Sequence, residues 1–229
     1  MGINYSPKIV TDGLVLYLDA ANSRSYPGTG NTWFDLSGKG NHGTLINGVG
    51  YSSDNKGSMV FDGVNDYIDN GNTNSLNSIG GTSNITVSSW VLYTAYGGGG
   101  RSYSVITVKG FPWTWLLENP SNKFRFRISA SGSDVNVADS SVHSLNFWYN
   151  VVGTYDGSNM KIYVNGVLKN TKSQTGVLAT NSISAKIGTY RGTDYNLNGK
   201  VSNVKIYNRA LTELEIQKNF NATKGRYGL

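Results

Sequence analysis

The chain has 229 residues, of which 38% are apolar, 12% aromatic and only 15% charged. This length suits one large all-β domain, because sandwiches and barrels of this size are often single units. The absence of cysteine excludes disulfides, thiolate metal sites and a cysteine nucleophile. The longest apolar run near the start, LVLYL at 14–18, is far too short to span a membrane.

The net charge of +6 is unevenly distributed along the chain. Residues 161–229 hold 11 Lys and Arg against 3 Asp and Glu, whereas residues 1–160 hold 9 against 11. A basic C-terminal third suits an acidic partner protein or a nucleic acid. Because the cations are spread singly and not in a block, we expect no nucleic-acid binding and favour a solvated surface with a cationic tail.

Strand patterns follow one another along the chain. Apolar or alternating stretches bounded by turn formers predict strands at 13–19, 85–93, 123–129, 147–156, 160–166 and 201–208. In KFRFRIS the two phenylalanines and the isoleucine share one face, and Arg125 and Arg127 share the other. Short strands over the whole length predict an all-β, two-sheet antiparallel sandwich.

Two local signals define elements in the second half. Asn165-Gly166 lies between apolar runs, and Asn-Gly tolerates the positive φ of a tight hairpin, so strand 160–164 is predicted to turn into strand 167–171. Thr212 followed three residues later by Glu215 is a capping-box pattern and predicts one helix over 212–221.

The last residues have little to fold around, so we expect them to dock on a neighbouring molecule or to fray. They end in residue types that anchor protein interfaces. The side chains expected to contact a partner protein are Lys224, Arg226, Tyr227 and Leu229.

Five stretches together resemble a known family. They are WFDLSGKGNHGTL, MVFDGVNDYI, FWYNVVGTYDGSNMKIYVNGVLKN, KIGTYRG and GKVSNVKIYNRALTELEIQKNFNATKGRYG. In this order they resemble the laminin-G-like, concanavalin A-like lectin/glucanase family, and the terminal part of the last, IYNRALTELEI…NFNATKGRYG, is similar to forms frequent in bacteriophage structural proteins. The resemblance implies a jelly roll of two antiparallel sheets, which agrees with the strand pattern. We therefore expect an N-terminal extension over 1–12, the jelly-roll domain over 13–222 and a tail over 223–229.

The resemblance leaves function open, because this fold hosts lectins, glycosidases and virion proteins. Glycosidases of the family carry their acids on one strand, as a ladder resembling E-x-D-x-E. Of the three glutamates here, Glu213 and Glu215 lie in the predicted helix, and Glu118 has no acidic residue within ten positions. We therefore expect no enzyme activity and no required cofactor.

Two non-enzymatic functions remain. The first is a structural or decoration protein of a phage particle, at the capsid surface, fibre or tail, with other virion proteins as partners. The alternative is a lectin-like module, extracellular or at a cell surface, that binds polysaccharide; a glycoside hydrolase is the least favoured.

A glycan-binding face needs exposed aromatic rings on loops, because the C–H faces of sugars pack on such rings. Trp90 and Trp148 lie within apolar strands and are assigned to the core. For the tryptophans of GFPWTWLL, a place at the rim and a place in the core both stay open. The glycan-binding candidates are Tyr96, Tyr103, Trp113, Trp115, Tyr190 and Tyr195.

The stretch FDGVNDYIDNGN holds three carboxylates within eight positions, Asp62, Asp66 and Asp69. Members of the family bind Ca²⁺ at a sandwich edge through Asp or Asn side chains and backbone carbonyls, and Ca²⁺ takes six to eight oxygens from flexible loops. The alternative is turn chemistry, in which Asp62 accepts hydrogen bonds from backbone N–H groups ahead of Gly63. A calcium site and a sandwich corner both remain open at this stretch.

Overall fold

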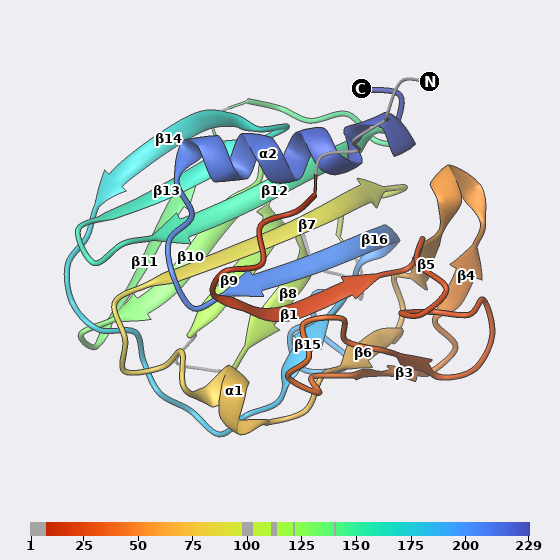
Figure 1. The fold of residues 1–229 in the computed structure, drawn as a ribbon, viewed down its shortest axis with the longest axis horizontal. Helices are drawn as coiled ribbons and strands as arrows, with labels where there is room; N and C mark the ends of the chain where they lie inside the picture. Colours follow the sequence, from red (N-terminus) through yellow and green to blue (C-terminus); the bar gives the residue numbers. More distant parts are fainter. Residues whose placement is uncertain (1–7, 98–102, 111–113, 121, 140) are drawn as a thin grey trace.

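The computed structural model describes residues 8–229 except 98–102, 111–113, 121 and 140. Two eight-stranded antiparallel sheets pack face to face, and the helix α2 (Glu213–Thr223) lies across the outer face of one of them, as Figure 1 shows. The all-β jelly-roll sandwich with one short C-terminal helix is therefore confirmed.

The sheet beneath α2, called sheet A, is built around the ten-residue strand β16 (Asn198–Tyr207). One edge of β16 pairs with β7 (Ile85–Tyr93), and its other edge is shared by β5 (Ser58–Asp62) and β1 (Leu14–Asp19). The sheet continues beyond β7 through β12 (Trp148–Tyr155), β13 (Asn159–Val164) and β14 (Val167–Ser173), and beyond β5 through β4 (Gly50–Ser52).

The opposite sheet, called sheet B, runs in the order β11–β10–β9–β8–β15–β6–β3–β2. Its first four strands are β11 (Ser133–Ala138), β10 (Arg125–Ala130), β9 (Trp115–Pro120) and β8 (Tyr103–Lys109). Its others are β15 (Ala185–Ile187), β6 (Tyr67–Asp69), β3 (Gly43–Ile46) and β2 (Thr32–Trp33). Three short helices complete the described part of the fold: η1 (Asp54–Lys56), α1 (Asn74–Asn77) and η2 (Lys224–Arg226).

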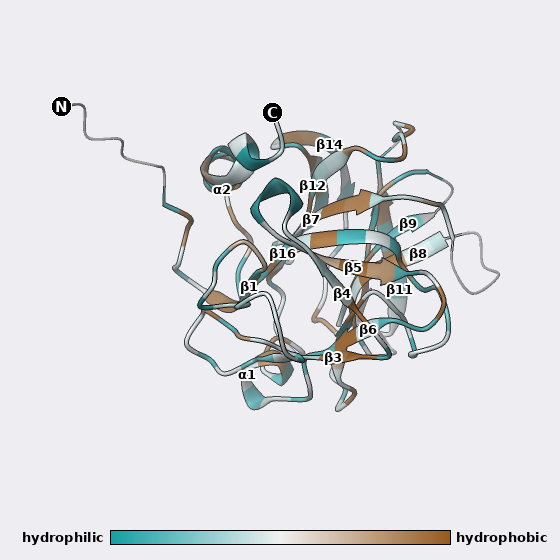
Figure 2. Ribbon diagram, turned by 90° about the vertical axis from the view of Figure 1, so that its right-hand side faces the viewer, coloured by the Kyte–Doolittle hydropathy of each residue, from teal (hydrophilic) through white to brown (hydrophobic). Residues whose placement is uncertain are grey.

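The main core fills the space between the two sheets, which Figure 2 shows from the side. Phe126 and Ile128 of β10 are fully buried there, as the alternation in KFRFRIS predicts. Gly153 of β12 lies directly against Phe126, and a Cβ on that glycine would come within 2.3 Å of the ring. The two sheets can approach this closely only because position 153 has no side chain.

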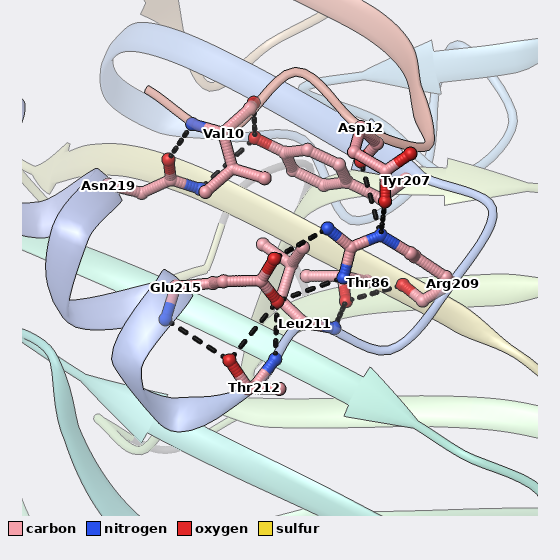
Figure 3. A network of polar contacts seen from close by, with 9 residues as sticks. All are labelled: Val10, Asp12, Thr86, Tyr207, Arg209, Leu211, Thr212, Glu215 and Asn219. Carbon is pink, nitrogen blue, oxygen red and sulfur yellow. Dashed lines mark hydrogen bonds and ion pairs between the residues drawn. The ribbon is translucent and has the colours of Figure 1, made fainter. Parts of the chain in front are cut away.

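The predicted hairpin and helix cap are both confirmed. Asn165 and Gly166 have φ values of 52° and 77° and join β13 to β14. Thr212 caps α2 and exchanges hydrogen bonds with Glu215 in a full capping box. Arg209 adds a bidentate ion pair to the same carboxylate, with N–O distances of 2.9 and 2.6 Å (Figure 3).

The N-terminal segment and α2 are tied to sheet A by a second group of bonds, also drawn in Figure 3. The Asn219 side chain accepts from the Val10 N–H at 2.8 Å and donates to the Tyr207 hydroxyl at 3.0 Å. The Tyr207 hydroxyl in turn donates to the Val10 carbonyl at 3.0 Å. Val10 is buried, so this residue of the expected N-terminal extension packs on the domain, and the division at residue 12 stays a prediction.

The C-terminal tail is ordered on its own domain. Tyr227 stacks on Trp90 with ring centroids 3.9 Å apart and lies 4.9 Å from the ring of Trp148. Arg226 contacts the buried Asp19 carboxylate at 2.7 Å. The expectation that the tail has little to fold around is wrong, because residues of β1, β7 and β12 contact it. Trp90 and Trp148 are buried as predicted, but beneath this tail.

None of the helices among the described residues is long and apolar enough to cross a membrane.

Candidate functional site

Three of the six glycan-binding candidates meet on the outer face of sheet B. Tyr103 begins β8, and Tyr190 and Tyr195 belong to the loop that joins β15 to β16. The rings of Tyr103 and Tyr195 are stacked at 4.3 Å, and Tyr190 lies 6.1 Å from Tyr195. All three side chains are half-buried, and they are called the tyrosine cluster below.

The cluster sits on an apolar base and a well-bonded loop. Val105 and Val108 of β8 are buried beneath Tyr190 and Tyr195. The Val105 N–H donates to the Tyr195 carbonyl at 2.9 Å, which ties the loop to β8. The Thr189 hydroxyl donates to the Asn196 side chain at 2.7 Å and closes the loop at its base. The rings are therefore held in place before a ligand arrives.

A buried ion pair lies beside the cluster. Glu118 of β9 is fully buried, and its Oε1 accepts from Arg125 Nε at 2.5 Å and lies 3.6 Å from Arg127 Nη1. The Arg125 guanidinium is also 5.7 Å from the centre of the Tyr103 ring, within the range of a cation–π contact. Tyr103 is thus fixed between Arg125 and Tyr195.

The Tyr103 hydroxyl stays uncharged at neutral pH. Burial, followed by the hydrogen bond with Tyr195 and the nearby Glu118 charge, raises the pKa of Tyr103 to about 12. Its hydroxyl is therefore a phenol that can both donate and accept hydrogen bonds. Such a group suits the hydroxyls of a sugar.

A small hollow opens on the other side of Tyr190. It has a volume of about 200 Å³ and is lined by Gly110, Ile183, Tyr190 and Arg191. The Arg191 guanidinium lies 4.8 Å from the centre of the Tyr190 ring. The hollow is smaller than the 300–1,000 Å³ that is typical of drug-sized ligands. It has room for one ring-sized group, with an aromatic and a cationic wall.

The other candidates lie elsewhere. Tyr96 is half-buried beyond the end of β7, where its hydroxyl donates to the His143 carbonyl. Trp115 has no exposed surface and belongs to the main core, so its assignment to a glycan-binding rim is wrong. Strand alternation alone could not decide which sheet face it occupies. Trp113 lies outside the described residues.

The three carboxylates of the 62–69 corner do not converge on one point. Asp62 Oδ1 accepts from the Val64 N–H at 2.7 Å, and Asp66 Oδ2 accepts from the Asp62 N–H at 3.1 Å. Asp69 instead forms an ion pair with Lys186 at 3.0 Å on the outer face of sheet B. No group of three acidic or histidine side chains that could hold a metal occurs among the residues the structure describes. In this arrangement the three carboxylates do not fit a single calcium site, and calcium binding at this corner is left to the metal-removal experiment of the Discussion.

Glu118 with its two arginines is the feature that sequence reasoning missed. The alternation in KFRFRIS correctly placed Arg125 and Arg127 on the outer face, but their partner lies on the neighbouring strand. The pairing of β9 with β10 sets Glu118 directly opposite Arg125. A lone glutamate beside a strand with alternating arginines is the signal that could have pointed to this contact.

Comparison of the sequence with protein families gives a match over residues 61–217, more than half of the chain, to the Concanavalin A-like lectin/glucanases superfamily. The chain belongs to this superfamily. Comparison with curated proteins gives no match. The laminin-G-like, concanavalin A-like resemblance is therefore confirmed, whereas its phage character stays a prediction.

Solved structures with the same fold include binding domains of clostridial toxins. The binding domain of Paraclostridial Mosquitocidal Protein 1 has a TM-score of 0.73 at 20% identity over 93% of this chain. The botulinum neurotoxin serotype D binding domain has a TM-score of 0.69 at 16% identity over 92%. Botulinum neurotoxin type C, whose cell entry is dependent upon interaction with two ganglioside molecules, has a TM-score of 0.71 at 16% identity over 93%. This chain spans 52% of the length of each of these structures. At identities of 16–20% the likeness shows the fold alone.

Proposed function

We propose that this chain is a non-enzymatic glycan-binding module that binds sugar on the outer face of sheet B. The observation that carries the proposal is the tyrosine cluster of Tyr103, Tyr190 and Tyr195. Aromatic rings offer flat apolar surfaces to the C–H faces of sugars, and phenol and guanidinium groups bond the sugar hydroxyls. The half-buried rings and the ring-sized hollow beside Tyr190 supply both kinds of contact.

The surroundings of Glu118 support binding without hydrolysis. Retaining glycosidases need two carboxyls about 5 Å apart. The residues opposite Glu118 on the two adjoining strands are Val105 and Arg125. Within the described part of these strands, the register therefore sets no carboxylate opposite Glu118. The structures of similar fold named above are binding domains, which agrees with this interpretation.

Glycan-array screening followed by calorimetry with the best glycan tests the proposal. We expect Tyr190→Ala and Tyr195→Ala to weaken binding at least tenfold, because each loses a stacking surface. Tyr51→Ala is the matched control, since Tyr51 also belongs to a tyrosine pair, 5.2 Å from Tyr26, but lies in β4 of sheet A. An array without specific binding, or equal effects of all three changes, would refute the proposal. Turnover of a β-glucan that Glu118→Gln abolishes would refute its non-enzymatic part.

A second candidate is a structural or decoration role on a phage particle, at the capsid surface, fibre or tail. It is supported by the stretch over 206–228, which is similar to forms frequent in phage structural proteins and which forms the end of β16, all of α2 and most of the docked tail. The two functions are compatible, because a particle protein with a glycan-binding face would contact other virion proteins and a cell-surface polysaccharide. Mass spectrometry of purified particles tests this role, and absence from particles would leave an extracellular or cell-surface location.

A further inference from the structure

Two adjoining hollows surround the end of α2, on the opposite side of the sandwich from the tyrosine cluster. The larger, of about 520 Å³, lies between the N-terminal segment, β1 and α2, and the smaller, of about 440 Å³, lies between η1 and η2. They share Ala222, Thr223 and Arg226 as a common wall. Together they form a continuous surface, called the terminal cleft below.

The charge of the terminal cleft has one sign. Lys8 and Arg24 line the larger hollow, Lys56 lines the smaller, and Arg226 lines both. None of the described residues that line either hollow is acidic. Lys8, Arg24 and Lys56 are exposed and form no ion pair with another described residue. Arg226 is paired with the buried Asp19 at 2.7 Å, so the unpaired positive charge of the cleft comes from Lys8, Arg24 and Lys56.

The larger hollow also has apolar walls. Ile9, Leu14, Leu36 and the ring of Tyr17 line it beside the cations. A sulfated sugar has no large apolar group to place against such walls, and the bases of a nucleic acid have only the Tyr17 ring to stack on. An acidic peptide can carry Leu, Ile or Phe side chains that fill the apolar part. The chemistry of the cleft therefore favours a peptide over the other polyanions.

The walls of the cleft are fixed in advance. The hydrogen bonds among Val10, Asn219 and Tyr207 hold the N-terminal segment against α2 (Figure 3). The stack of Tyr227 on Trp90 and the ion pair of Arg226 with Asp19 hold the other wall. A preformed site loses little conformational entropy when a ligand binds.

We propose that the terminal cleft docks an extended acidic segment of a partner protein. Its carboxylates contact Lys8, Arg24 and Lys56, its path crosses Arg226, and its apolar side chains enter the larger hollow. This site is separate from the proposed glycan-binding face, so the module can hold a partner protein and a glycan at the same time.

Selection from a displayed library of random decapeptides tests the proposal, with the whole chain as bait. We expect the enriched peptides to combine Asp or Glu with Leu, Ile or Phe. In fluorescence anisotropy, Lys8→Glu, Arg24→Glu and Lys56→Glu should each weaken binding of a labelled selected peptide at least fivefold. Lys172→Glu on β14 is the matched control, because it makes the same charge change at an exposed site away from the cleft, and it should change affinity less than twofold.

The charge reversals lie at exposed positions and should leave the melting temperature unchanged, which separates lost binding from lost folding. Three outcomes would overturn the proposal. They are a selection that enriches no peptides or peptides without an acidic excess, binding that survives all three reversals, and binding of a heparin oligosaccharide or single-stranded DNA at the cleft where no peptide binds.

Discussion

Removing the ring of Tyr227 should destabilise the whole domain, although this residue lies only two positions from the last. The ring stacks on Trp90 at 3.9 Å and contacts Trp148 at 4.9 Å. Aromatic pairs contribute about 0.5–1.5 kcal/mol each beyond area burial, and truncating a fully buried aromatic side chain to alanine costs about 3–5 kcal/mol. Since Tyr227 is partly exposed, we expect Tyr227→Ala to cost about 3 kcal/mol. For a chain of this length that corresponds to a fall of about 6–12 °C in melting temperature.

Thermal denaturation followed by circular dichroism measures this effect. Tyr227→Phe keeps both ring contacts and should stay within about 1 kcal/mol of the wild type. Leu229→Ala is the second control, because Leu229 is 50% exposed and close in sequence. A fall of less than 1 °C for Tyr227→Ala, or an equal fall for Leu229→Ala, would mean that the ring contacts of Tyr227 do not stabilise the fold as argued.

Three further predictions concern charged groups. The Arg209 ion pair lowers the pKa of Glu215 from 4.5 to about 2. The stabilisation of the fold by this pair is therefore complete above pH 4.5 and is lost as the pH falls toward 2. Acid titration of wild type against Glu215→Gln should show a difference of about 1–2 kcal/mol in unfolding free energy after solvent screening, and superimposable curves would contradict it. Burial lowers the pKa of Lys205 to about 8, below the unfolded value of about 10.4. Because the unfolded chain then binds more protons between these values, urea denaturation should show the unfolding free energy rising from about pH 8 to 10 relative to Lys205→Met. A parallel or falling trend would contradict this prediction. Because the 62–69 carboxylates serve turns and an ion pair, we expect EDTA to leave the melting curve unchanged, whereas a bound calcium ion at a hundredfold excess over Kd would add about 2.7 kcal/mol.

Elements defined by local signals could be predicted from the sequence. β7 occupies 85–93 as the alternation indicates, and the Asn165-Gly166 turn and the Thr212 cap stand where their chemistry requires. Each of these signals involves residues close together in the chain. They act within one element and need no knowledge of the sheet pairing.

The candidate site could be predicted only in part. Tyr103, Tyr190 and Tyr195 were each singled out for their loop positions, but their convergence depends on β15 lying beside β8. The position of Trp115 stays open in the sequence, because alternation shows which residues of a strand share a face but not which face is buried. The docking of the tail could not be predicted either, because Trp90 lies 137 positions before Tyr227 in the chain and no local sequence signal joins them.

The position of the two ends of the described chain determines how the module would be displayed on a larger assembly. Val10 lies against α2, and the tail packs on β7 and β12 just beyond the end of the same helix, so both ends leave from the side of sheet A (Figures 1 and 2). A polypeptide joined at either end, or a surface to which either end is anchored, would therefore lie behind sheet A. Tyr190 and its neighbours would then point away from the attachment and toward the surroundings.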